Sequence, residues 1–122
     1  MLRVFDGWQE VLARSISGPE LAKRLGVSRQ RLNVLRREDR LLGLKVPIRR
    51  ELHYPVWQFG EDGQPLTAMP RLLEAAREAR LDPRDLDALM VSASAGAGKP
   101  PIEHLRAGDE EYVLGIIRAA GE

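Results

Sequence analysis

The sequence predicts a mainly α-helical protein: an N-terminal helix-turn-helix with a small β-hairpin wing, then a small helical C-terminal domain. Two observations lead to this fold class. Only 5% of the residues are aromatic, so leucine and alanine, both strong helix formers, must supply most of the packing. In addition, two short amphipathic segments meet at a glycine within residues 17–37, which is the pattern of two helices joined by a tight turn.

A first helix is expected over residues 5–13. Asp6 is placed to cap it, and Trp8, Val11 and Leu12 fall on one face at helical spacing. A third helix of this kind is what a small helix-turn-helix module needs to bury its core.

Residues 17–37 are expected to form the two helices of the helix-turn-helix. Ser17 and Glu20 have the spacing of a capping box, and Gly26 can adopt the sharp turn that ends a helix. Ser28 is placed to cap the second helix, whose apolar positions are Leu32 and Leu35. The same pattern also suits two core helices in a protein that never contacts DNA.

Two strands are expected after the second helix, over residues 41–48 and 52–59. Apolar residues alternate in the first, and the second is rich in aromatic and branched residues. Pro55 cannot donate to a ladder, so one side of the second strand cannot be fully paired. This hairpin would be a wing, with Arg49 and Arg50 at a polar tip that serves either phosphate contact or solubility.

Basic and polar side chains on the second helix and the hairpin make up the candidate DNA-binding site. They lie off the apolar face, and their chemistry suits base edges and phosphates. The candidates are Ser28, Arg29, Gln30, Arg31, Asn33, Arg36, Arg37, Lys45, Arg49 and Arg50.

The charge is divided unevenly along the chain. Residues 1–59 hold twelve Lys and Arg against six Asp and Glu, a net charge of +6, whereas residues 60–122 hold seven against twelve, a net charge of −5. A basic half fits a polyanion, and an acidic half indicates a different partner. The polar turn over residues 60–65 is therefore the expected boundary between a winged helix-turn-helix domain (1–59) and a helical domain (60–122).

The C-terminal half is expected to be helical throughout. A helix runs from Thr67 or Ala68 through Arg80, and the pair Asp82 and Pro83 starts the next. After a flexible stretch of small residues (92–98), a short helix follows Pro100 and Pro101. Asp109 is placed to cap the last helix, and acidic residues fill that helix's first turn.

Several function classes are excluded by what the sequence lacks. It contains no cysteine, which removes disulfides, thiolate metal sites and cysteine nucleophiles. No signal peptide or membrane-spanning run is evident, so we expect a cytoplasmic protein. The segment around Lys99 fails the phosphate-loop pattern because Ala93 and Pro100 stand where glycine and Ser or Thr are required. We therefore expect no enzyme, no metal site, no catalytic residues and no cofactor.

The order of features over residues 17–120 resembles the antitoxins of the Xre/MbcA/ParS toxin-binding-domain family, partners of RES-domain toxins. Three segments that follow the helix-turn-helix carry this resemblance. They are Tyr54-Pro55-Val56-Trp57-Gln58-Phe59, Gly63-Gln64-Pro65-Leu66, and residues 98–105 (GKPPIEHL) with Gly108-Asp109.

The resemblance implies a DNA-binding antitoxin that neutralises a RES-type, NAD-degrading toxin by direct binding. It also implies a homodimer that binds its own operator in duplex DNA and represses its own promoter. Toxin contact would fall on the C-terminal segment. The partner-binding candidates there are Lys99, Pro100, Glu103, His104, Arg106, Asp109 and Glu110.

Two other functions remain open from the sequence. One is a stand-alone helix-turn-helix transcriptional regulator whose C-terminal half serves only for dimerisation. The other is a protein-binding adaptor in which the two helices are a structural core. Steep salt dependence of duplex binding would distinguish both DNA-binding hypotheses, the antitoxin and the stand-alone regulator, from the adaptor.

Overall fold

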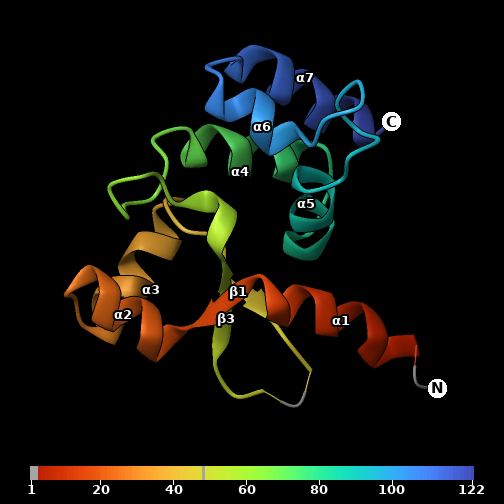
Figure 1. Ribbon diagram of the computed structural model, residues 1–122. Coiled ribbons are helices and arrows are strands. Elements are labelled where there is room, and N and C mark those ends of the chain that lie inside the picture. The colour runs from red at the N-terminus through yellow and green to blue at the C-terminus, as the bar shows by residue number, and fades with distance from the viewer. Residues whose placement is uncertain (1–2, 48) are drawn as a thin grey trace. The chain divides into compact units, whose positions relative to one another are not determined.

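The computed structural model describes residues 3–47 and 49–122 of the chain. Over these residues the backbone forms seven α-helices, one 3-10 helix and a three-stranded antiparallel sheet, so the fold is mainly α with a small β-hairpin, as predicted (Figure 1). The chain divides into two compact units, Met1–Thr67 and Ala68–Glu122, here called unit 1 and unit 2. The polar turn that we expected at the boundary belongs to unit 1, because Leu66 N donates to Gln58 O at 2.8 Å and Gly60 N to Gln64 O at 2.9 Å.

Unit 1 begins with helix α1 (Arg3–Ala13). The prediction that Asp6 caps this helix is wrong, because the helix starts at Arg3 and Asp6 lies inside it. Val11 is buried, and Trp8 is half-buried. The chain then enters strand β1 (Ser15–Ser17), which the sequence analysis did not foresee.

Helices α2 (Gly18–Leu25) and α3 (Arg29–Arg37) follow directly, with the predicted bounds. Ser17 Oγ accepts from the backbone N of Glu20 at 3.3 Å, and Ser28 Oγ accepts from that of Arg31 at 3.1 Å. Only half of the expected capping box is used in this way, since the Glu20 carboxylate accepts from Arg24 Nε at 3.0 Å. Gly26 ends α2 in the left-handed conformation (φ 69°), where glycine has no Cβ penalty.

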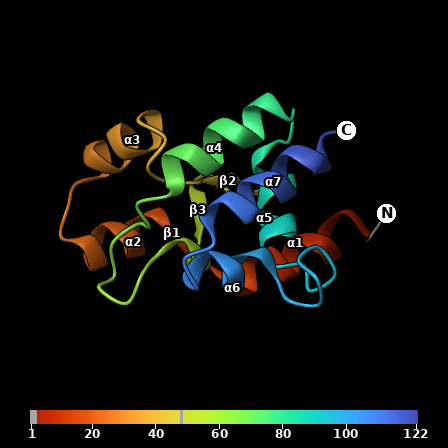
Figure 2. The same ribbon diagram turned by 90° about the horizontal axis from the view of Figure 1, so that it is seen from above.

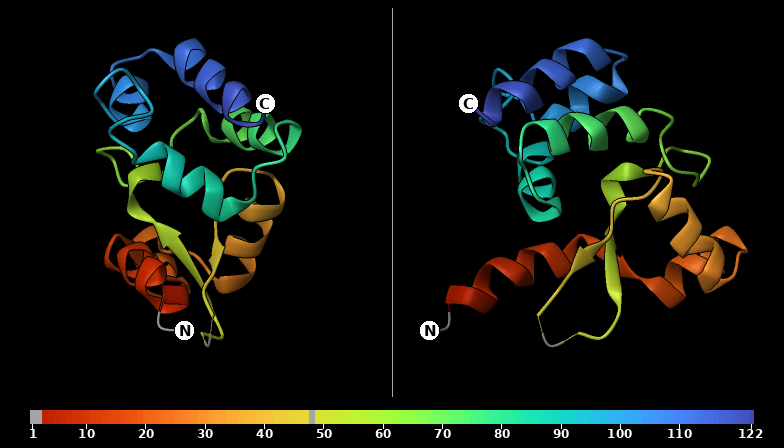
Figure 3. Two further views of the ribbon diagram at one scale, coloured as in Figure 1. Left: turned by 90° about the vertical axis from the view of Figure 1, so that its right-hand side faces the viewer. Right: turned by 180° about the vertical axis from the view of Figure 1, so that it is seen from behind.

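The sheet has the order β1-β3-β2, formed by β1, β2 (Leu44–Lys45) and β3 (Leu52–Pro55). Ile16 is opposite Tyr54 across β1 and β3, and Leu44 is opposite His53 across β2 and β3. The hairpin of β2 and β3 is seen from two sides in Figure 3. Both strands are shorter than predicted; Ile48, at the end of the predicted first strand, lies outside the described residues.

Two structural features explain why the strands are short. Pro55 ends β3, and residues Val56–Gln58 form a 3-10 helix, η1, instead of continuing the strand. The backbone of Leu42 bonds to a side chain rather than to a strand: its N donates to Gln58 Oε1 at 2.8 Å, and its O accepts from Gln58 Nε2 at 2.9 Å.

The core of unit 1 joins both helices to the hairpin. Five buried side chains form its centre: Leu21, Leu32, Leu35, Leu41 and Tyr54. Partly buried residues from α2 and the turn after it, Ala22, Leu25 and Val27, pack against that centre. This core fixes α3 against α2 and β3.

Unit 2 consists of helices α4 (Met69–Glu78), α5 (Pro83–Met90), α6 (Pro101–Arg106) and α7 (Glu110–Ala120). Helices α4 and α7 lie side by side (Figure 2). Helix α5 starts at the Asp82-Pro83 pair, as predicted, and Asp82 and Asp85 form a complete capping box there. Asp109 occupies the cap position of α7, but its side chain makes no capping hydrogen bond, which corrects that expectation.

Within the described part of the chain, the longest apolar stretch of any helix is too short to cross a membrane. The same residues contain no group of three or more His, Asp or Glu side chains arranged to hold a metal ion.

Candidate nucleic-acid interface

The burial of two leucines determines which side of α3 is exposed. Ser28 fixes the start of the helix, and Leu32 and Leu35 then point into the core of unit 1. Arg29, Asn33 and Arg36 follow one another at helical spacing and form one stripe beside that buried face. The stripe therefore carries two guanidinium groups and one amide on a single side of the helix.

This stripe borders a groove of about 260 Å³ within unit 1. Gly18 and Pro19 at the start of α2 form part of the groove, and the hairpin forms the remaining wall. The α3 and hairpin residues that line it are Arg29, Leu32, Asn33, Arg36, Arg50, Glu51, Leu52 and Tyr54. Three arginines against one glutamate give the groove an excess of positive charge, which favours an anionic ligand.

Most of the candidate arginines form no ion pair or hydrogen bond with the described part of the chain. Inside the described part of the chain, the side chains of Arg29, Arg31, Arg37, Arg49 and Arg50 form no ion pair or hydrogen bond. All five are exposed. Their charge is therefore available to a polyanion, and no internal salt bridge must be broken for them to bind one.

Arg36 is held differently from those five arginines. Its Nη1 donates to Asn33 Oδ1 at 3.0 Å and to the hydroxyl of Tyr54 at 3.3 Å. The Arg36 side chain is half-buried, and that of Tyr54 is buried in the core of unit 1. Arg36 thus links the exposed stripe of α3 to the strand beneath it.

No protein-family model matches the sequence, and no curated protein matches it either. The fold resembles that of Rv2175c. The NMR structure of that protein superposes with a TM-score of 0.75 over 88% of this chain and 81% of that chain, at 17% sequence identity. At this identity the likeness establishes the fold alone.

The remaining DNA-binding candidates lie outside the groove. Ser28 caps α3, while Gln30, Arg31 and Arg37 are exposed on the helix away from the groove lining. Lys45 is exposed on β2, and Arg49 is exposed near the hairpin tip. The structure therefore brings four candidates together at the groove, namely Arg29, Asn33, Arg36 and Arg50.

Sequence reasoning missed the residues that shape the groove from beneath. Tyr54 is 18 positions from the arginine that it contacts, and no local pattern signals a pair so far apart. Gly43 was also missed: a Cβ built on it would lie 3.3 Å from Arg36 Cδ and 3.3 Å from Tyr54 Cε1. The only hint was that a glycine interrupts the predicted first strand.

The partner-binding candidates all lie in unit 2, around α6. Lys99, Glu103, Arg106 and Asp109 are exposed, and Pro100 is half-buried. His104 has a structural contact, because its Nε2 lies 2.6 Å from the carbonyl oxygen of Gly96. Its ring also meets that of Tyr112 edge-on, with the centroids 4.8 Å apart. His104 therefore joins the loop before α6 to α7.

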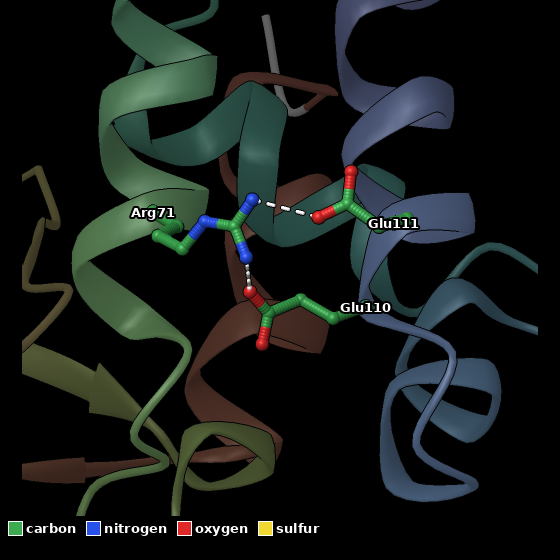
Figure 4. A network of polar contacts seen from close by, with 3 residues as sticks. All are labelled: Arg71, Glu110 and Glu111. Carbon is green, nitrogen blue, oxygen red and sulfur yellow. Dashed lines mark hydrogen bonds and ion pairs between the residues drawn. The ribbon is translucent and has the colours of Figure 1, made fainter.

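Glu110, the last of these candidates, is paired inside unit 2. Arg71 on α4 contacts both Glu110 and Glu111 at the start of α7, with Arg71 Nη2 2.7 Å from Glu111 Oε2 (Figure 4). The hydrogen bond to Glu111 is the main cause that raises the pKa of Arg71. The sequence placed these acids in the first turn of α7, and the structure adds a link from them to α4.

Proposed function

We propose that unit 1 is a winged helix-turn-helix that binds duplex DNA, with α3 as the recognition helix and the hairpin of β2 and β3 as the wing. The observation that carries this proposal is the groove that joins α3 to the hairpin. There Arg29, Asn33 and Arg36 on the helix share one site with Arg50 on the hairpin. Exposed arginines elsewhere on α3 and the hairpin, which form no ion pair within the described part of the chain, supply further charge.

The residue types fit the two tasks of a DNA-binding surface. An α-helix fits the major groove, where arginine, asparagine and glutamine are the side chains that read base edges. Arg29, Gln30 and Asn33 are therefore assigned to base contact. Lys45, Arg49 and Arg50 are assigned to phosphates, which fix the register of a protein on DNA without carrying sequence information.

The test is to measure binding of the full-length protein to duplex DNA at two salt concentrations, after selecting a preferred sequence from a randomised pool. We expect affinity for the selected duplex to fall steeply as salt rises. Arg29→Ala and Asn33→Ala should reduce the difference in affinity between the selected and random duplexes. Arg49→Ala and Arg50→Ala should instead lower the affinity for both duplexes by the same factor. If all four variants bind like the wild type, this interface is misassigned.

We further propose that unit 2 binds a protein, and that this protein is a RES-type toxin which the chain neutralises. The two proteins would then form a toxin–antitoxin system of type II, in which this chain also represses its own promoter as a homodimer. The support is the resemblance of three segments to that antitoxin family, together with exposed charged residues in and around α6, namely Lys99, Glu103, Arg106 and Asp109.

Co-purification from the native host tests this second proposal. We expect a RES-type protein to be recovered with the wild type. The double variant Glu103→Lys with Asp109→Lys should no longer recover that protein but should still bind duplex DNA. Recovery of the chain alone, as a dimer that still binds DNA, would instead support a stand-alone regulator that uses unit 2 only for dimerisation.

A further inference from the structure

A chain of three side chains runs from the core of unit 1 to the exposed surface of α3. The hydroxyl of Tyr54, which is only 3% exposed, accepts from Arg36 Nη1 at 3.3 Å. The same Nη1 donates to Oδ1 of the exposed Asn33 at 3.0 Å. Because Tyr54 is fixed by the core, it limits where the guanidinium of Arg36 can lie, and Arg36 in turn limits the amide of Asn33.

Gly43 supports this arrangement independently. A Cβ at position 43 would lie 3.3 Å from both Arg36 Cδ and Tyr54 Cε1, and 3.1 Å from Leu52 Cδ1. The aliphatic stem of Arg36 and the edge of the Tyr54 ring therefore both approach a position that has no side chain. The absence of a side chain at Gly43 leaves room for Arg36 beside the Tyr54 hydroxyl.

The hydrogen bond from Arg36 changes what Asn33 can recognise. An asparagine reads adenine by accepting from N6 with Oδ1 and donating to N7 with Nδ2. Here the bond from Arg36 takes one of the two lone pairs of Oδ1, and the positive charge beside that oxygen disfavours a second donor such as the amino group of adenine. The amide N–H groups of Asn33 stay available as donors. Guanine presents two acceptors, O6 and N7, in the major groove.

We infer that Tyr54 is a positioning residue which, through Arg36, makes Asn33 act mainly as a hydrogen-bond donor toward DNA and so directs α3 to guanine rather than adenine at the base that Asn33 contacts. This inference rests on the proposed function of unit 1. It assigns the specificity at one base of the target to three residues, of which only Asn33 and Arg36 lie on α3.

The test compares the sequences that full-length wild type, Asn33→Ala and Tyr54→Phe select from a randomised duplex pool. Wild type should select guanine at the one position that Asn33→Ala relaxes. Tyr54→Phe should lower the preference for guanine over adenine there about tenfold, the size expected for one well-placed base contact. Its affinity for random duplex and its salt dependence should not change, since no phosphate contact is lost. Tyr112→Phe removes the other tyrosine hydroxyl, in unit 2, and should change nothing.

A measurement without DNA separates the inference from the proposed function. In the free protein, the side-chain amide NMR signal of Asn33 should shift in Tyr54→Phe and stay in place in Tyr112→Phe. The inference is overturned if that signal does not move, if Asn33→Ala relaxes an adenine or a pyrimidine, or if Tyr54→Phe selects the same sequence as wild type with equal stringency. If the Asn33 signal shifts in Tyr54→Phe but the wild type binds no duplex, the DNA-binding proposal and the guanine assignment are overturned together. The linkage of the three side chains would still stand.

Discussion

Gln58 shows at the scale of one residue how unit 1 is held together. Its side chain is fully buried, and the amide makes three hydrogen bonds to backbone groups. Two of these satisfy the N and O of Leu42, and the third is from Nε2 to the carbonyl oxygen of Pro55 at 3.0 Å. One amide therefore fixes the segment before β2 to the segment after β3, and this sets where the hairpin begins and ends.

Replacing this amide with a carboxylate should destabilise unit 1. Gln58→Glu can still accept from Leu42 N, but it loses both donors and faces two carbonyl oxygens, and a buried polar group left unpaired costs about 1–3 kcal/mol. We expect a loss of at least about 2 kcal/mol in denaturant unfolding at neutral pH. Gln64→Glu makes the same change at an exposed residue and should stay within about 0.5 kcal/mol of wild type. Equal stability of the two variants would contradict this role.

The sequence predicted apolar core residues better than buried polar ones. Leu32 and Leu35 were identified because helical spacing places both on one face, and both are buried. Gln58 and Asp87 are also fully buried, but a polar residue carries no sign of burial in the sequence. Its partners decide whether it can be buried, and those of Gln58 include Leu42, which is 16 positions away.

At the scale of elements, the helices were predicted well because their signals are local. Ser28, Gly26 and the Asp82-Pro83 pair mark helix ends through contacts within a few residues. The sheet depends on distant contacts. The short strand β1 exists because Ser15–Ser17 pairs with His53–Pro55, and nothing in three residues could indicate that partner.

Two glycines of unit 2 should respond in opposite directions to the same substitution. A Cβ at Gly96 would lie 2.5 Å from the carbonyl oxygen of Lys99 and 2.9 Å from His104 Cδ2, so Gly96→Ala must displace backbone. We expect it to destabilise the protein by about 1–3 kcal/mol. Gly115 lies within α7 with nothing within 4 Å of the added atom, and Gly115→Ala should stabilise by up to about 1 kcal/mol. Thermal melts of both variants check the signs; a destabilised Gly115→Ala or a neutral Gly96→Ala would refute this account of the packing.

The contact between α4 and α7 should depend on salt. Arg71 pairs with Glu110 and Glu111 at the surface, and exposed ion pairs are screened as ionic strength rises. Arg71→Gln should lower the melting temperature most at low salt, and the difference from wild type should shrink at high salt. Arg118→Gln removes the same charge from a residue without an ion pair in the described part of the chain, so it should have a smaller effect. A salt-independent loss in Arg71→Gln would point to packing instead.

At the scale of the whole molecule, the sequence predicted which surfaces carry charge but not which residues meet. Helical spacing predicted that Arg29, Asn33 and Arg36 lie off the apolar face of α3. Their meeting with Arg50 and Tyr54 depends on the path of the chain from residue 37 to residue 54, which no local pattern determines. The charge division survives the structural boundary: unit 1 holds twelve Lys and Arg against eight Asp and Glu, and unit 2 holds seven against ten.

This division allows the position of charge to be tested separately from its total. Arg49→Glu with Arg50→Glu, in the hairpin of unit 1, changes the net charge by as much as Lys99→Glu with Arg118→Glu, in unit 2. If the hairpin contacts phosphates, the first pair should weaken binding to every duplex and reduce the slope of log affinity against log salt by about 2. The second pair should keep the wild-type slope, because only residues that contact phosphates release counterions on binding. Anisotropy titrations over several salt concentrations measure both slopes. Equal losses in the two variants would mean that net charge alone drives binding, and the hairpin would then not be a wing that contacts DNA.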